Sequence, residues 1–595
     1  VFVPLVFLGG ITAVFFRALA MTMVTALAAS LFLAIFFTPV MAGVVFRGRP
    51  LPDGRGAERG GVEGAGGTEA EALEAAEQAG EGRVMRWGTA RYEAALHWAL
   101  AHTGVVMIAA VAILAGSVGI YKQLGSGFLP EMDEGAFVLD YIMPAGTSLQ
   151  ESDRVLLHIE QFLRATPEVE SYSRRTGARL ALAIAEPNTG DFLVKLKRGR
   201  RRPLEEVTAE LRGKIVRSEP AIEVEFPHIL EDLIGDLSWS PQPIEVKVYH
   251  DDPAVFKAVA KGVEEWLPKV KGVVDVVNQT IVVGPAVNFR VDPERAQRAG
   301  FGVKDVAGLE SAILDGELAS NMIRGNRLVG IRVRYPAEYR SSVETLKSLL
   351  LTSPTGVTTS LGSLAEVEME QGVTEIHRDN LQEMTSVTAR LEGRDLGSAV
   401  QEIQRRLPKE VHLPAGTDVE YGGLYKIQQE SFRALTQVLL TSILLIFIIL
   451  VFEFRSFSHP IAILGATILC AFGALGALWV TGSTLNVASF MGAIMVVGIV
   501  QKNGILMLDA EKRFTAEGFE LREAIFRAGR RRLRPILMTA LATIAGMLPL
   551  ALGIGSGAQL LQPLAIAVIG GVAVSMVLSL VITPVLFCWL RGRRL

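Results

Sequence analysis

The sequence predicts a polytopic α-helical membrane protein that carries a large α+β block of ferredoxin-like (βαβ) subdomains. The mean hydropathy over the chain is +0.35, which is typical of a membrane protein with a sizeable water-soluble part. Several apolar runs reach the roughly 20 residues that a helix needs to cross a bilayer. Between two groups of these runs lies a long polar stretch of mixed strand and helix patterns, and such a mixture predicts small α+β sandwiches.

Six apolar runs are predicted to span the membrane, and a seventh follows near the C-terminus. They are roughly 18–46, 103–121, 435–454, 460–482, 485–508 and 535–554, and then 563–590. Residues 1–10 resemble the tail of another span, so we expect the chain to begin inside a longer protein. Lys and Arg crowd three segments, at 47–91, at 512–534 and at the C-terminus. This bias places those segments in the cytoplasm of the cell.

The orientation divides the chain into five parts. Residues 1–46 are the end of one membrane helix plus a full one, and residues 47–102 are a cytoplasmic Gly/Ala/Glu-rich linker and an amphipathic segment. Residues 103–122 form a membrane helix, and residues 123–433 form the exported block. Residues 434–595 hold five membrane helices with a cytoplasmic basic loop at 509–534. In a Gram-negative cell the exported block lies in the periplasm and the helices lie in the inner membrane.

Alternating and helical patterns can be assigned inside the exported block. Strands are predicted at 243–250, 272–281, 285–292, 328–336 and 386–393, and helices at 252–270, 293–314 and 395–408.

No enzyme motif occurs in the sequence. It lacks a GxxxxGK[ST] phosphate loop, an HExxH pair and a GxSxG elbow, so neither an ATP-driven pump nor a hydrolase is indicated. The net charge of −3 gives no sign of nucleic-acid binding. Cys470 and Cys588 stand alone in apolar runs, and the eight histidines are scattered, so no metal site or other cofactor is predicted.

The polar residues Lys502 and Asn503 interrupt the apolar run "VGIVQKNGILML". Lys502 is seven residues from Asp509 at the cytoplasmic end of the run, a depth of roughly 10 Å at 1.5 Å per residue. A lysine near the centre of a membrane helix costs about 2.5–3.5 kcal/mol. It can snorkel toward the surface, or it can be a buried ammonium that pairs with a carboxylate. Glu453 and Asp509 both lie at helix ends, so any such partner is expected outside this sequence.

Long motifs resemble the resistance–nodulation–division (RND) efflux permeases. They are "VGIVQKNGILMLDAEKRF", "RRRLRPILMTALATIAGMLPLALGIGSGA", "GSGFLPEMDEGAFVLDYIMPAGTSL" and the opening 43 residues. The resemblance covers the chain apart from its linker, and it implies a C-terminal part that runs from the end of helix five to helix twelve. It implies two porter subdomains and half of a docking domain in the periplasm. It also implies a trimer, a periplasmic adaptor protein, an outer-membrane channel and proton flow as the energy source.

The resemblance also implies a proton relay. Lys502, followed by Asn503, matches the lysine that pairs with two aspartates of the family's fourth helix, and these aspartates have no counterpart here. Arg532 and Thr539 match an arginine and a threonine that join the relay. Two simpler interpretations stay open: Arg532 as a cytoplasmic anchor, and Thr539 bonded back to its own helix.

The substrate class is predicted from departures from the copper/silver branch. That branch uses clustered methionines, whereas the methionines of the exported block are unpaired and Phe301 stands where one is expected. The Lys502–Asn503 pair is also absent from the metal types. We therefore expect export of hydrophobic or amphiphilic compounds, with Phe301 as a weak substrate-contact candidate or as plain core. Heavy-metal cation efflux is the alternative, and a non-transporting export accessory is a third reading.

Overall fold

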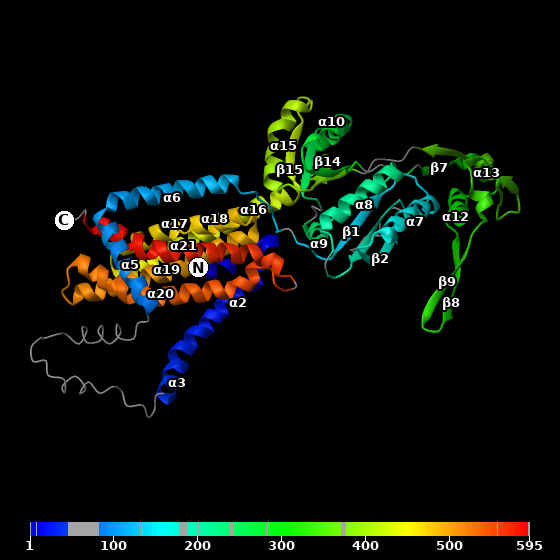
Figure 1. Ribbon diagram of the computed structural model, residues 1–595. Coiled ribbons are helices and arrows are strands. Elements are labelled where there is room, and N and C mark those ends of the chain that lie inside the picture. The colour runs from blue at the N-terminus through cyan, green and yellow to red at the C-terminus, as the bar shows by residue number, and fades with distance from the viewer. Residues whose placement is uncertain are drawn as a thin grey trace, which may run out of the picture.

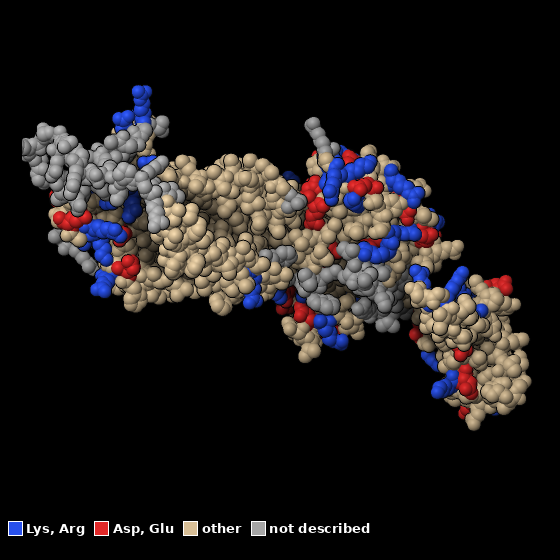
Figure 2. All heavy atoms as spheres, turned by 90° about the horizontal axis from the view of Figure 1, so that it is seen from below, with Lys and Arg blue, Asp and Glu red and all other residues tan. Residues whose placement is uncertain are grey.

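The computed structural model has two parts, a bundle of long helices and an α+β part that extends from one end of it (Figure 1). It describes residues 2–7, 9–45, 83–130, 132–177, 188–199, 201–238, 242–280, 284, 286–370, 376–555 and 557–592. The Gly/Ala/Glu-rich stretch of the predicted linker lies outside these residues. Figure 2 shows that Lys, Arg, Asp and Glu gather at the two ends of the molecule and leave a broad uncharged belt over the bundle. Such a belt is what a bilayer requires of a membrane-spanning surface.

Seven helices are long and apolar enough to cross a membrane, counted over the described part of the chain. They are Phe16–Val44 (within α2, η1 and α3), Thr103–Gln123 (α6), Gly423–Phe454 (α16), Ser458–Val480 (α17 and α18), Val487–Ala516 (α19), Leu521–Ala551 (α20) and Ala558–Gly592 (α21). Each overlaps one of the seven predicted runs.

The helices extend further than hydropathy predicts. Helix α16 begins at Gly423 rather than near residue 435. Helix α19 continues to Ala516 and α20 begins at Leu521, so the predicted basic loop at 509–534 is helical apart from a short connection. Hydropathy detects the membrane-embedded length, whereas a helix continues through polar residues once its backbone hydrogen bonds are propagated. A further helix, α5 (Arg83–Ala101), precedes α6.

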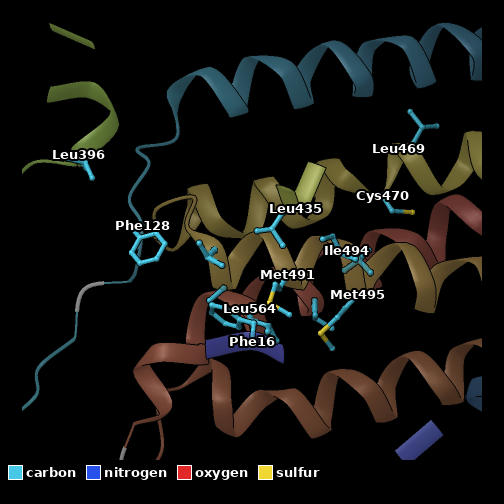
Figure 3. Close-up of a cluster of buried hydrophobic side chains, with 14 of the residues drawn as sticks. Phe16, Phe128, Leu396, Leu435, Leu469, Cys470, Met491, Ile494, Met495 and Leu564 are labelled. Carbon is cyan, nitrogen blue, oxygen red and sulfur yellow. The ribbon is translucent and has the colours of Figure 1, made fainter. Parts of the chain in front are cut away.

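The core of the bundle surrounds α21. Figure 3 shows Phe16 of α2 beside Leu564 of α21 and close to Met491 and Met495 of α19. These four side chains belong to the largest buried apolar cluster among the described residues. The N-terminal helix is therefore packed into the same core as the C-terminal ones.

The first α+β unit has the βαββαβ order of a ferredoxin-like fold. Its elements are β1 (Ala136–Ile142), α7 (Leu149–Ala165), β2 (Val169–Thr176), β3 (Thr189–Leu196), α8 (Leu204–Ser218) and β4 (Glu223–Glu225). The antiparallel sheet has the order β2-β3-β1-β4. Helix α7 begins where the Ser148 side chain accepts from Glu151 N, and its apolar face covers this unit's own core.

The second unit repeats this topology. Its elements are β5 (Ile244–Tyr249), α10 (Pro253–Trp266), β6 (Val273–Asn278), β14 (Gln382–Leu391), α15 (Leu396–Glu410) and β15 (Asp418–Gly422). Its central strands are ordered β6-β14-β5-β15, with β13 (His377–Asp379) on β14. Helix α9 (Ile229–Ser238) links the two units. The ferredoxin-like prediction is therefore confirmed for both.

A third unit with its own core is inserted between β6 and β14. It contains β7 (Ala286–Val291) paired with β12 (Ala365–Glu370), and helices α11 (Pro293–Arg298) and α12 (Val303–Leu314). Strands β8 (Glu317–Arg324) and β9 (Arg327–Val333) form an exposed hairpin that extends away from it (Figure 1). The single helix predicted at 293–314 is wrong, because Gly300 adopts a left-handed φ of +79° and ends α11.

Candidate functional site

Helix α19 carries the intramembrane lysine, and local sequence features determine where this helix begins and which of its faces packs against the other helices. It starts at Asn486, whose side chain accepts from Ser489 N while the Ser489 hydroxyl accepts from Asn486 N. Asn503 and Gly504 face inward, and a Cβ on Gly504 would lie only 3.2 Å from the Ile463 side chain of α17. Small residues permit this close approach of two membrane helices. The opposite side of α19 is therefore the side that Lys502 occupies.

Lys502 is exposed on the surface of the helix bundle. Asp509, one of its two candidate partners in the sequence, instead lies 3.1 Å from Arg513. No ion pair joins Lys502 to a carboxylate within the described ranges. An ammonium without a partner at this depth is unfavourable unless its stem carries it toward the surface.

The other two residues of the predicted relay lie on α20, which packs beside α19. The Arg532 side chain is half-buried, and its Nε has no hydrogen-bond partner among the described atoms. Thr539 is exposed, and its hydroxyl donates to Ile536 O at 3.1 Å, back to its own helix. The four predicted relay residues thus lie on two neighbouring helices, and among the described residues no hydrogen bond or ion pair joins the α19 pair to the α20 pair.

Phe301 lies in a hydrophobic core, as the second of its two predicted roles requires. Its side chain is 3% exposed and belongs to the core of the inserted third unit, with Ala296 and Val306. It lines neither of the two cavities described for the protein. Position in the core explains the aromatic residue fully.

The α+β part holds a cavity of about 510 Å³ where its first two units meet the membrane end of the protein. Its lining includes Met132, Glu134, Glu205, His228 and Glu231. The Glu134 carboxylate accepts from Leu230 N at 3.1 Å, yet burial raises its pKa above the ordinary value. The wall thus offers oxygen, imidazole and thioether donors. Among described residues, no group of three or more His, Cys, Asp or Glu is arranged to hold a metal ion.

Two arginines in this wall, Arg212 and Arg390, were not singled out by sequence reasoning. Arg390 lies in the predicted strand "SVTARLEG". An arginine between small and apolar residues of a strand was the one sequence signal that could have indicated a buried charge. Both pair with carboxylates of the neighbouring unit. The charged wall is therefore built from both units.

A third polar cluster, centred on Glu511, lies at the cytoplasmic end of α19. Glu511 is 1% exposed and accepts from the Thr515 hydroxyl at 2.8 Å. Its other neighbours are Arg591 Nη1 of α21 at 3.4 Å and His459 Nε2 of α17 at 3.6 Å. One buried carboxylate thus joins three membrane helices.

Comparison with known proteins identifies the family. The chain matches the AcrB/AcrD/AcrF family over residues 1–591. It is 31% identical to the cobalt-zinc-cadmium resistance protein CzcA of Cupriavidus metallidurans, over 99% of this chain and 54% of that protein. It is 27% identical to the multidrug resistance protein MdtC of Yersinia pestis, over 100% of this chain and 56% of that protein. The crystal structure of a heavy metal efflux pump superposes with a TM-score of 0.75 and 28% identity, over 86% of this chain and 53% of that one.

The chain spans about half the length of the curated relatives it matches. The shared architecture assigns the α+β part to the periplasm and agrees with the bacterial inner membrane as the location of the helices. The chain belongs to the AcrB/AcrD/AcrF family of RND permeases, which are multi-pass membrane transporters and not enzymes.

Proposed function

We propose that the chain is part of a heavy-metal cation efflux permease. The observation that carries this proposal is the likeness, along nearly the whole chain, to a protein named for cobalt, zinc and cadmium resistance. The solved heavy metal efflux pump adds support from the fold. In the remaining length of the protein we expect the other membrane helices and a second periplasmic block.

The donors in the cavity wall suit a borderline divalent cation. Carboxylates come from Glu134, Glu205 and Glu231, imidazole from His228, and the only sulfur in the described lining from Met132. Imidazole and carboxylate donors bind Zn²⁺ and Co²⁺ well, whereas Cu⁺ prefers several sulfur ligands. We therefore expect Zn²⁺ or Co²⁺, rather than Cu⁺ or Ag⁺, to be the exported substrate.

Proton flow is the proposed energy source, with Lys502, Asn503, Arg532 and Thr539 in the relay. The exposed position of Lys502 supports this, because the open face can receive a carboxylate from the part of the protein outside this chain. Protonation of that carboxylate removes the partner of Lys502 and biases the helices between two packings. By the same family likeness we propose a trimer that works with a periplasmic adaptor and an outer-membrane channel.

The test uses the full-length protein in liposomes with a pH-sensitive dye inside and a pH gradient across the membrane. Zinc added on the side of the periplasmic part should drive protons across the membrane, which the dye reports as a change of internal pH. Lys502→Met should abolish this zinc-dependent proton flow. Lys512→Met is the matched control, because Lys512 is exposed on the same helix and lies 5.8 Å from the Phe454 ring. Zinc-coupled proton release that survives in Lys502→Met would contradict the relay.

A second candidate is export of hydrophobic compounds. It is favoured by the Lys502–Asn503 pair and by the likeness to MdtC. It is also the function that the sequence alone predicts. The comparisons support cation export better, and the core position of Phe301 adds no support to a hydrophobic site. In the same liposomes, proton release by a hydrophobic dye but not by zinc would favour this second candidate.

A further inference from the structure

Helix α21 contains a proline where a regular helix needs an amide. Pro584 lies inside the helix, and an amide at this position would donate to the carbonyl four residues earlier, that of Leu580. Proline has no N–H, so the Leu580 carbonyl loses its donor within the helix. Leu580 is buried, and a buried carbonyl without a donor is unfavourable. In a membrane helix a neighbouring group commonly supplies the missing donor.

The donor comes from α5, the helix that precedes α6. The Tyr92 hydroxyl donates to Leu580 O at 3.1 Å, and Tyr92 is 8% exposed. Helix α20 leaves room for this hydroxyl at Gly529, because a Cβ there would overlap the Tyr92 hydroxyl oxygen. Helix α5 packs against both α20 and α21, and Figure 1 shows it crossing the bundle near the C-terminus. Tyr92 therefore lies in the seam between α20 and α21.

Two further contacts hold α5 along α20. The His97 ring packs against the Phe526 ring with a centroid distance of 4.0 Å, and Glu93 Oε1 lies 3.5 Å from Arg530 Nε. Phe526 and Arg530 lie on the face of α20 that Gly529 shares, because these positions are three or four residues apart. The ion pair is partly exposed and contributes little. The buried tyrosine hydrogen bond is therefore the specific contact of α5 in the seam.

A second helix with the same motif solves the same problem in another way. The sequence Thr-Pro-Val occurs at 38–40, in the N-terminal span, and at 583–585, in α21. Before the first of these prolines the helix makes a π turn, η1 (Leu33–Phe37), and Thr38 N bonds five residues back to Leu33 O. Such a turn changes which carbonyls find an amide. Helix α21 is α-helical through its proline, so it relies on the hydroxyl of α5 instead.

The seam lies one helical turn from a predicted relay residue. Arg532 follows Gly529 by three residues on α20, and its side chain is half-buried. Its Nε has no hydrogen-bond partner among the described atoms, so no such bond at Nε fixes its position. The position of Arg532 then depends on how α20 is set against α21. Tyr92 contacts both helices at this point, and a loss of its hydrogen bond favours a state in which α5 leaves and water reaches the Leu580 carbonyl.

We infer that Tyr92 is a positioning residue for the proton relay: its hydroxyl replaces the amide that Pro584 lacks, and this bond docks α5 in the seam that sets α20, with Arg532, against α21. The inference rests on the proposed function, because it adds a residue to the same relay. It gives α5 a task beyond joining two membrane spans.

The test combines amide exchange with proton flow, both in liposomes that hold the full-length protein. Tyr92→Phe removes only the hydroxyl and leaves the Leu580 carbonyl without a donor while α5 is docked. Amide exchange of α5, followed by mass spectrometry, should therefore accelerate about tenfold. Zinc-dependent proton flow should slow in the same variant, because α20 is no longer held in place.

Pro584→Ala is the informative second change, because it supplies the missing N–H. Alone it should behave as the wild type, since one carbonyl oxygen can accept two hydrogen bonds. Combined with Tyr92→Phe it should restore both the slow exchange of α5 and the proton flow. A tyrosine that acted only through the packing of its ring would not be rescued in this way.

Two controls match these changes. Pro563 also lies inside α21, but the carbonyl that it leaves without an amide is that of Gln559. Tyr92→Phe combined with Pro563→Ala should therefore behave as Tyr92→Phe alone. Tyr121→Phe removes the hydroxyl of an exposed tyrosine on α6 and should behave as the wild type.

Three results overturn the inference. They are unchanged α5 exchange in Tyr92→Phe, accelerated exchange that Pro584→Ala does not restore, and wild-type proton flow in a variant whose α5 exchange is accelerated. The last result would leave the tyrosine docking α5 but would refute its role in the relay. If the wild type shows no zinc-dependent proton flow, the proposed function fails and the positioning role fails with it. The exchange rates then still decide whether the hydroxyl replaces the amide.

Discussion

Replacement of Gly473 by alanine tests whether two membrane helices are held at backbone contact. Gly473 of α18 (Ala471–Val480) faces Gly570 of α21. A Cβ on Gly473 would overlap the Gly570 carbonyl oxygen and lie 2.6 Å from Val574 Cβ. Because a backbone atom is the obstacle, the helices have to move apart. Overpacking costs about 1–3 kcal/mol, and alanine regains about 1 kcal/mol of helix propensity. We expect a net loss of up to about 2 kcal/mol in the free energy of unfolding relative to the wild type, and a loss of about 1–3 kcal/mol relative to an alanine placed without overlap on the same helix.

The assay is the unfolding midpoint of the purified full-length protein in detergent, followed by tryptophan fluorescence against denaturant. Gly476→Ala is the matched control, since it lies one turn along the same helix and no atom lies within 4 Å of its added Cβ. The control should be unchanged or slightly stabilised. Equal midpoints for wild type, Gly473→Ala and Gly476→Ala would refute the close approach of α18 and α21.

Three further changes have defined outcomes. Glu511→Gln should lower the free energy of unfolding by roughly 1–3 kcal/mol, because Arg591 loses its charged partner, whereas replacement of the half-exposed Asp509 by Asn should leave it unchanged. Phe301→Ala should destabilise the third unit by about 3–5 kcal/mol, seen as faster amide exchange there. Burial raises the pKa of Glu310 on α12 to about 7 from 4.5. The folded state then holds a proton that the unfolded state releases, so stability falls as pH rises through this range. Amide protection of α12, corrected for intrinsic rates, should show this fall, and Glu310→Gln should remove it.

The sequence located the membrane helices well because their signal is local. Each span is a contiguous apolar run, and composition alone separates it from its surroundings. The ends were less accurate where a polar segment continues the helix. Residues 423–434 contain Lys426, Gln428 and Glu430. These polar residues indicate that this part of α16 lies outside the membrane, not that the helix begins after them. The break at Gly300 was missed because one glycine within a helical pattern is common.

The site was predictable only in part, for a different reason. Lys502 was conspicuous because a charge in an apolar run is costly, but its exposure depends on which helices surround α19. Arg212 and Arg390 were missed because their ion-pair partners are distant in the sequence; Arg212 and Glu392, for example, are 180 residues apart. Charged residues are ordinary in water-soluble segments, so their type carries no signal. Asp275, which pairs with Arg212, had one local sign, namely that it is the single acidic residue in "GVVDVVN".

The direct passage from β15 into α16 has a mechanical consequence. Strand β15 ends at Gly422 and the helix begins at Gly423, which has a φ of +71° and whose amide donates to Glu245 of β5. The sheet thus sets the rotational phase of a rod of 32 residues, about 48 Å long at 1.5 Å per residue. One inserted residue would turn the whole membrane face of that rod by about 100°. Because no linker residue separates β15 from α16, a tilt of the periplasmic sheet is transmitted directly to this membrane helix.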